Sequence, residues 1–233
     1  MVKGSAMASS QIQGDRYDGA AEWYDERNAA PADANRDTLK DLLGPGGGLC
    51  LDLGCGTGQN LPALRGRGRR VIGLDFSVDQ LGLARQRTVG GEALVQADAA
   101  VLPFADAVFD SVVAVWLSTD VDDFAAVLGE ASRVLRPGGV LVHLGAHPCF
   151  CGPHTEGRAD GGRIIHPTYR GAGWHPPAPW WREGGIRHRI GMRHLPLAEL
   201  FNAFIGARLT ITRVVEPSEE PIPWTLALRA EKR

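Results

Sequence analysis

The 233-residue sequence has no long basic stretch and no long apolar stretch. Its formal net charge is −2, and its densest basic segment, residues 65–70, has the pattern of a solvated helix end rather than of a nucleic-acid face. No apolar run approaches the roughly 18–20 residues that cross a bilayer, and the small, polar first residues do not resemble a secretory signal. We therefore expect no nucleic-acid partner, no membrane partner and a location in the cytoplasm.

Cysteine is also scarce, and the four residues do not form a disulfide framework, which suits a reducing compartment: Cys50, Cys55, Cys149 and Cys151. The last two lie in the run HPCFCGPH, whose histidines invite a zinc interpretation. Structural zinc sites separate their cysteines by about two to four residues, whereas one residue separates these, and two prolines restrict the loop. We expect no metal, and structural roles for His147, Cys149, Cys151 and His154.

The chain does contain enough apolar residues, 44%, for a substantial core, beside 22% charged residues. After a tail or expression remnant at 1–14, we expect a single domain over 15–233. From residue 49, short apolar runs alternate with helical stretches, which predicts a doubly wound α/β fold with a mostly parallel sheet and helices on both faces. The expected strands are 49–53, 71–74, 94–96, 109–115 and 140–144, and the helices between them are 59–65, 78–87 and 121–135.

Outside this alternation, two helices at 19–28 and 32–43 are expected before the first strand. A helix at 197–206 and strands at 209–215 and 224–229 are expected at the end. Residues 147–181 hold six of the 15 prolines, with many aromatic residues and histidines. This segment is too rich in proline for a helix and too apolar for a linker, so we expect an ordered insert at 146–191, after the fifth strand.

The strongest local signal is LDLGCGTGQN at 51–60, which places three glycines between a buried strand and a helix: Gly54, Gly56 and Gly58. Glycines there let a ligand approach the backbone closely. A dinucleotide fingerprint is G-x-G-x-x-G, whereas here the third glycine comes one residue earlier. Asp52 precedes the loop, and a carboxylate there suits a ligand with an ammonium group better than a diphosphate. The alternative is a plain strand-to-helix turn.

Acidic residues also follow the second and third expected strands. Asp75 lies twenty-one residues after Gly54, an offset at which a carboxylate can accept hydrogen bonds from both hydroxyls of a ribose. Phe76 can pack on an adenine face, and Asp98, beside Ala99, can receive the adenine amino group. Alternatively, Asp75 is a helix cap and Asp98 a loop residue.

Four blocks now resemble a known family in order and spacing: LDLGCGTG, VIGLDFS, QADAAVLPFADAVFDSVVAV and EASRVLRPGGVLV. They are similar to class I S-adenosylmethionine-dependent methyltransferases of the ubiquinone/menaquinone-biosynthesis type, over about residues 49–144. The resemblance implies a seven-stranded sheet with the last strand antiparallel. It also implies S-adenosylmethionine as cofactor, lying across the carboxyl ends of the strands, and S-adenosylhomocysteine as product.

The resemblance further implies roles for matched positions. The loop near the methionine moiety would comprise Asp52, Gly54, Cys55, Gly56, Gly58 and Asn60. Asp75 would hold the ribose, Asp98 and Ala99 would lie beside the adenine, and Val115 and Trp116 would lie under the sulfonium. Residues 15–44 resemble a helical lid, in which Tyr17, Trp23 or Tyr24 closes over the cofactor. The histidine pair that many relatives carry after the fourth strand is replaced here by WLSTD, which removes that source of a base.

The insert is where substrate choice is expected, because aromatic side chains can wall an apolar pocket. The candidates are Trp116, His147, Phe150, Tyr169, Trp174, Trp180 and Trp181. A private core of the insert is an equal alternative. A general base is needed for a hydroxyl or carbon-acid acceptor, and His147, just past the fifth strand, is the first candidate, before His166 and His194. A structural role is at least as good an explanation for each histidine.

We thus expect methyl transfer to a small-molecule metabolite, at oxygen, nitrogen or carbon, by in-line displacement on an aligned acceptor. The setting would be secondary metabolism, and the protein a monomer or homodimer. An NAD-type oxidoreductase is disfavoured by the glycine spacing and by the lack of a visible Tyr-x-x-x-Lys pair. A protein that binds S-adenosylmethionine without methylating remains a third hypothesis.

Overall fold

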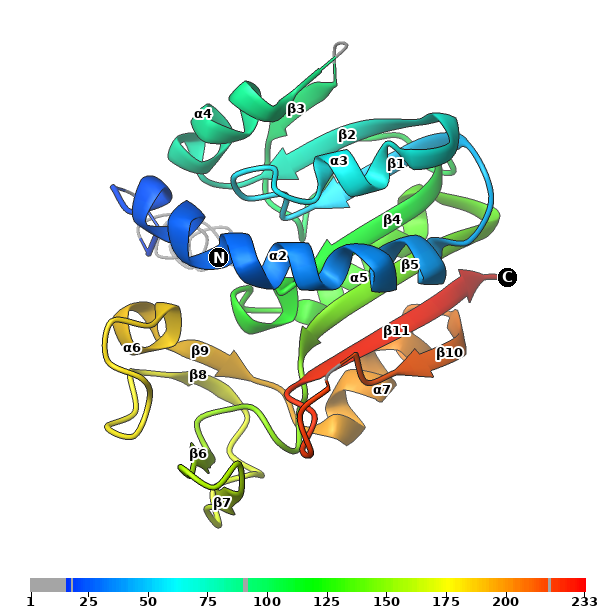
Figure 1. Ribbon diagram of the computed structural model, residues 1–233. Helices are drawn as coiled ribbons and strands as arrows, with labels where there is room; N and C mark the ends of the chain where they lie inside the picture. The colour runs from blue at the N-terminus through cyan, green and yellow to red at the C-terminus, as the bar shows by residue number, and fades with distance from the viewer. Residues whose placement is uncertain (1–15, 18, 90–91, 218) are drawn as a thin grey trace, which may run out of the picture.

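The computed structural model describes residues 16–17, 19–89, 92–217 and 219–233, so the tail expected at 1–14 lies outside the described residues. Its centre is a seven-stranded sheet in the order β10-β11-β5-β4-β1-β2-β3 (Figure 1). The strands are β1 (Gly48–Leu53), β2 (Arg69–Asp75), β3 (Ala93–Gln96), β4 (Phe109–Val115), β5 (Leu135–Ala146), β10 (Leu209–Val215) and β11 (Thr225–Lys232). β11 is antiparallel to both of its neighbours, while the other paired strands run parallel. The predicted fold, including the antiparallel last strand, is confirmed.

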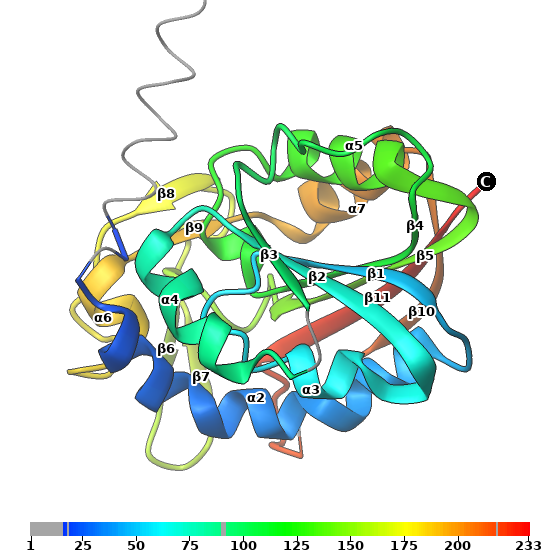
Figure 2. The same cartoon turned by 90° about the horizontal axis from the view of Figure 1, so that it is seen from above.

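Helices cover both faces of this sheet (Figure 2). On one face lie α2 (Ala21–Leu43), α3 (Leu61–Leu64) and α4 (Val78–Arg87), and on the other lie α5 (Phe124–Val134) and α7 (Leu197–Gly206). Short 3-10 turns, η1 (Gly66–Gly68) and η2 (Leu117–Thr119), follow α3 and β4. Each face has its own apolar cluster: Leu39, Leu42 and Leu61 on the α2 side, and Phe124, Leu128 and Phe204 on the α5 side, are fully or almost fully buried. Strands buried on both sides are why the sequence shows continuous apolar runs there.

The N-terminal helix differs from the prediction. One helix of 23 residues, α2, replaces the two helices expected at 19–28 and 32–43, and it continues through the proline at position 31. An interior proline costs a helix roughly 3 kcal/mol, so contacts on both sides of it must hold the helix together. Leu39 and Leu42 are fully buried in its second half, and in its first half Asp25 accepts hydrogen bonds from Gln59 and pairs with Arg87 at 2.8 Å.

The insert after β5 contains regular structure that the sequence analysis did not predict. Its elements are β6 (Thr155–Gly157), β7 (Arg163–Ile165), β8 (Gly173–His175), α6 (Ile186–Ile190) and β9 (Met192–His194). The strands pair as two small antiparallel hairpins, β6 with β7 and β8 with β9. Figure 1 shows that the insert lies beyond the carboxyl ends of the parallel strands, on the same side as the start of α2.

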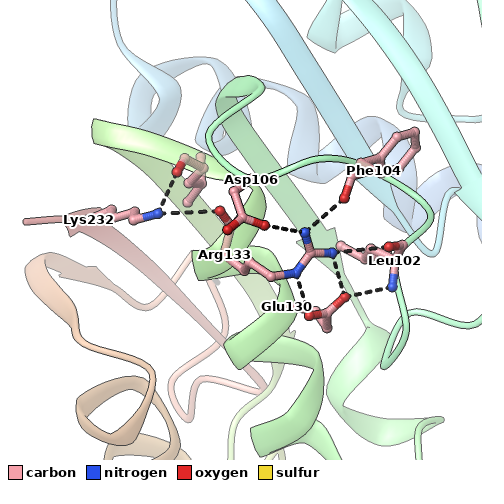
Figure 3. A network of polar contacts seen from close by, with 7 residues as sticks. Leu102, Phe104, Asp106, Glu130, Arg133 and Lys232 are labelled. Atoms are coloured by element: carbon pink, nitrogen blue, oxygen red, sulfur yellow. Dashed lines mark hydrogen bonds and ion pairs between the residues drawn. The ribbon is translucent and has the colours of Figure 1, made fainter.

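At the carboxyl end of α5, a polar network fixes the loop between β3 and β4 (Figure 3). Arg133 donates to the backbone oxygens of Leu102 and Phe104 and pairs with Asp106 and Glu130 at 2.7 Å each. Lys232, at the end of β11, donates to the backbone oxygens of Arg133 in α5, at 3.3 Å, and of Leu135, at 2.7 Å. One end of the sheet is thereby tied to α5.

In the described part of the chain, no helix has the length and apolarity needed to cross a membrane.

Candidate active site

The glycine loop turns sharply out of β1 and back over β2. Gly54, Gly56 and Gly58 all have positive φ, between +53° and +77°, a conformation that costs other residues strain. The amides of Gly54 and Cys55 both donate to the Leu74 oxygen, at 2.8 and 2.9 Å, which holds the loop at the carboxyl end of β2. Gly54 and Gly56 line a narrow cavity at this edge of the sheet.

The second half of the same loop faces the protein interior instead. A Cβ at Gly58 would lie 3.1 Å from the Ala84 backbone, so this glycine permits close packing of the loop on α4. Cys55 is buried, with its sulfur 3.0 Å from where a Cβ of Gly73 would stand. Asn60 is buried directly before α3. Cys55, Gly58 and Asn60, all predicted to contact the cofactor, do not line the cavity.

The carboxylate of Asp75 forms part of the cavity wall at the end of β2. It accepts the amide of Gly56 at 2.7 Å and that of Ser77 at 3.0 Å, so it ties the glycine loop to the start of α4. Burial raises the pKa of Asp75, while these amides act in the opposite direction. A carboxylate oxygen can accept more than one hydrogen bond, so Asp75 retains capacity for a ligand hydroxyl.

Asp52 lies beneath the loop and has no accessible surface. Neither of its carboxylate oxygens has a hydrogen-bond partner among the described residues. Burial, and then the charge of Asp75, raise the pKa of Asp52 to about 7. Burying a carboxylate without a hydrogen-bond partner is costly. The lack of a partner is what we expect if Asp52 is satisfied by a donor or cation that is not part of the chain.

Next along the edge, the wall is apolar. Phe76, Ala97 and Ala99 line the cavity, but Asp98 does not, because its Oδ1 accepts the Ala100 amide at 2.8 Å in its own turn. Ser77 and Gln80, at the start of α4, also line it and were not predicted.

Trp116 closes the cavity at the end of β4, together with Val115. It adopts the left-handed conformation, φ 61°, which is rare for a bulky residue and is held here by its surroundings. Its amide donates to the Leu144 oxygen at 2.7 Å, and its ring stacks on Trp224 with centroids 5.6 Å apart. The strained residue therefore directs its indole toward the space beyond the sheet.

The N-terminal segment covers the narrow cavity through two tyrosines. Tyr17 and Tyr24 both line it and pack edge to face, with centroids 5.4 Å apart. The Tyr17 hydroxyl donates to Asp120 at 2.8 Å, and Asp120 also pairs with Arg187 of α6 at 2.6 Å. Burial, and then the Asp120 charge, raise the pKa values of both tyrosines, so both hydroxyls stay neutral. Asp120 and Arg187 were missed because nothing in the sequence links residues 67 positions apart.

A wide cavity adjoins the narrow one and shares Tyr24 and Trp116 with it. Its volume is about 800 Å³, whereas the narrow cavity, packed by the two tyrosines, measures about 80 Å³. Of the predicted substrate residues, Trp116, Trp180 and Trp181 line the wide cavity. Trp224, Met192 and several arginines of the insert and α2 also line it and were not predicted.

The remaining substrate and base candidates lie outside both cavities. His147 is buried, with Nε2 2.9 Å from Glu216 and its ring stacked on Phe150. His194 donates from Nε2 to the Tyr169 oxygen at 2.7 Å, and burial lowers its pKa to about 4. Tyr169 binds the Leu197 amide through its hydroxyl. Trp174 lies under the guanidinium of Arg16, and His166 stacks on Trp180.

The histidines and cysteines of the insert are not arranged around a metal. Among the residues that the structure describes, no group of three or more histidine, cysteine or acidic side chains could hold an ion. His154 instead donates to the Cys149 oxygen at 3.2 Å, and its ring lies 4.5 Å from that of His194.

The part of the chain that contains the glycine loop is similar to known methyltransferases. Residues 51–143 match the family described as a methyltransferase domain. A demethylmenaquinone methyltransferase of Mycobacterium marinum is 39% identical over 134 residues, which cover 54% of this chain and 55% of that protein. The chain thus spans about half the length of the curated relatives that it matches. The resemblance to class I S-adenosylmethionine-dependent methyltransferases, recognised in the sequence over about residues 49–144, is confirmed by these matches.

Solved structures agree on the fold. An S-adenosylmethionine-dependent methyltransferase of Mesorhizobium loti superimposes with a TM-score of 0.72 and 26% identity, over 85% of this chain and 98% of that chain. The [4+2]-cyclase SpnF superimposes with a TM-score of 0.69 at 19% identity, over 96% of this chain and 97% of that one. The fold is therefore also that of a protein named for a different reaction, and function must be inferred from the site.

Proposed function

We propose that the protein transfers a methyl group from S-adenosylmethionine to a small molecule held in the wide cavity. One observation carries this proposal: a cavity bounded by Gly54, Gly56 and Asp75 opens, past Trp116, into a second space of about 800 Å³. A cofactor site that is joined to a separate site for the acceptor is what a group transfer between two small molecules requires.

The residues of the narrow cavity suit this cofactor. Asp75 offers a carboxylate to the ribose hydroxyls, Phe76, Ala97 and Ala99 offer an apolar surface to the adenine, and the glycines leave the backbone open to the amino-acid part. The unpartnered carboxylate of Asp52 lies under that loop and suits an ammonium group, directly or through water. Typical ligand sites measure roughly 300–1,000 Å³, so Tyr17 and Tyr24 must move apart when the cofactor enters.

When bound, the cofactor supplies an electrophilic methyl group on a positively charged sulfur. The chain has to align an acceptor with that methyl group and keep water away. Effective alignment lowers a barrier by about 7–11 kcal/mol in the best cases. Trp116 and Tyr24 belong to both cavities and are placed to do so. His147 and His194 line neither cavity, so alignment, rather than proton removal by these histidines, is the main contribution that we assign to the chain.

The second candidate is a protein of this fold that binds the cofactor and catalyses another reaction, which the likeness to SpnF favours. Docking on nucleic acid is not part of either proposal, because the chain has a net charge of −2.

The test combines binding with methyl transfer. We expect S-adenosylhomocysteine, but not NAD, to bind in calorimetry. We expect D75N to bind it at least about tenfold more weakly, because charge-assisted hydrogen bonds are lost, while D160N, in an exposed turn of the insert, binds as the wild type does. A screen with methyl-labelled cofactor against cell extract should then yield a labelled small molecule. Tight binding without any labelled product would favour the second candidate, and NAD binding would overturn both.

A further inference from the structure

The wall of the wide cavity is basic although the chain as a whole is slightly acidic. Four arginines line it, against a single carboxylate, that of Glu183: Arg27, Arg163, Arg182 and Arg187. The chain carries 25 basic and 27 acidic residues, so this local excess of positive charge is not a reflection of composition. The arginines come from α2 and from the insert, opposite the sheet.

One of these arginines is already neutralised. Arg187 pairs with both oxygens of Asp120, at 2.6 and 3.1 Å, and donates to the Thr119 hydroxyl at 2.7 Å. It therefore forms part of the wall rather than a free charge. The same pairing fixes α6 over the junction of the two cavities.

Arg163 and Arg182 are less satisfied. Arg163, on β7, reaches Glu220 only at 3.5 Å, and its buried Nε has no hydrogen-bond partner among the described residues. Arg182 is exposed to the cavity and pairs with no carboxylate in the described part of the chain. Buried unpaired donors are costly, so a ligand that accepts hydrogen bonds is the simplest reason for the Arg163 donor to be there.

Four tryptophans also line the wide cavity. Trp116 and Trp224 stack nearly parallel, 20° apart, and Trp180 and Trp181 lie on the insert side. The buried Nε1 of Trp180 likewise has no partner among the described residues. Cys151 adds no negative charge, because burial raises its thiol pKa, although the charges of Arg163 and Arg187 act against this. Cys151, Arg163 and Arg187 all line the wide cavity.

We propose that the methyl acceptor is an organic acid: an apolar, flat body that stacks on the tryptophans and carries a carboxylate or phosphate that binds Arg163 and Arg182. A guanidinium matches either anion with two parallel hydrogen bonds, and aromatic rings bind flat apolar groups. That the bound acid is methylated rests on the proposed function. Binding of an aromatic acid in the wide cavity does not depend on it.

Three probes that share one ring system test the charge. We would measure the binding of 2-naphthoate, 2-naphthyl phosphate and the neutral 2-naphthamide by calorimetry, with and without S-adenosylhomocysteine. At least one acid should bind about tenfold or more tightly than the amide, with the preference falling as salt rises. The better of the two acids identifies the anion as carboxylate or phosphate.

Variants locate the preference. In R163Q and in R182Q the acid should lose most of its advantage over the amide, while R158Q, an exposed arginine of the same insert that pairs with Asp160, should keep it. Thermal melting verifies that each variant is folded. Equal binding of acid and amide, no binding of any probe, or an acid preference that survives both substitutions would overturn the proposal. If the wild type bound naphthoate but did not bind S-adenosylhomocysteine, the proposed function alone would be contradicted.

Discussion

Substituting two glycines of the same loop by alanine should separate ligand binding from folding. At Gly58, φ is +77°, and an added Cβ would lie 2.9 Å from Leu61 Cδ1 and 3.1 Å from Ala84 Cα. The left-handed conformation costs alanine about 1–2 kcal/mol, and overpacking costs about 1–3 kcal/mol. We therefore expect G58A to lower the free energy of unfolding by about 2–5 kcal/mol, a large part of the total of a typical domain.

At Gly56 the balance is different. Its φ is +53°, but an added Cβ would meet only Gln80 Oε1 at 3.5 Å and Tyr24 at 4.0 Å, both of which line the narrow cavity. Only the conformational cost of about 1–2 kcal/mol applies to folding. The methyl group would instead occupy cofactor space, and we expect S-adenosylhomocysteine to bind G56A about tenfold or more weakly.

Urea unfolding and calorimetry on both variants check this contrast. G82A is the matched control, because Gly82 lies in α4, exposed, with nothing near its absent Cβ. Alanine there should change stability by no more than about 1 kcal/mol, in the stabilising direction. If G58A proved as stable as G82A, or if G56A bound the ligand as the wild type does, the division of the loop into a ligand half and a packing half would be wrong.

Two further predictions concern buried charge and the base. Burial raises the Asp52 pKa to about 7 from an ordinary value near 3.9, so the folded chain retains a proton that the unfolded chain loses. The contribution of Asp52 to stability should therefore fall as pH rises from about 4 to 7, and urea unfolding of D52N should show a smaller loss of stability over this range than the wild type does. The same slope in both proteins would contradict the pKa. H147Q should keep most of its turnover in the labelled-methyl assay, because His147 contacts Glu216 and lines neither cavity; loss of activity in a folded variant would restore this histidine as a base.

Much of the sheet could be predicted because its strands are buried on both faces. The run 109–115 is almost wholly buried and coincides with β4. The expected strand 209–215 and helix 197–206 also coincide with β10 and α7. These elements could be predicted from short-range patterns alone, because apolar periodicity and flanking turn residues can be recognised within a few residues of sequence.

Other features depend on contacts distant in sequence. The continuity of α2 past its proline rests on Gln59 and Arg87, which no local pattern reveals. In the insert, His154 and His194 each donate to a backbone oxygen, so two residues that suggested chemistry in the sequence instead hold segments of the insert together. The placement of Asp120 between Tyr17 and Arg187 likewise joins three segments that only the folded chain brings together.

The tryptophans of this protein also make its intrinsic fluorescence a probe of the wide cavity. Four of the chain's six, Trp116, Trp180, Trp181 and Trp224, line the wide cavity. The other two lie under guanidinium groups, Trp174 beneath Arg16 and Trp23 beside Arg27 and Arg189. Intrinsic fluorescence of the unlabelled protein is therefore weighted toward the space between insert and sheet, and its quenching by a candidate compound reports occupancy there without any assay of turnover.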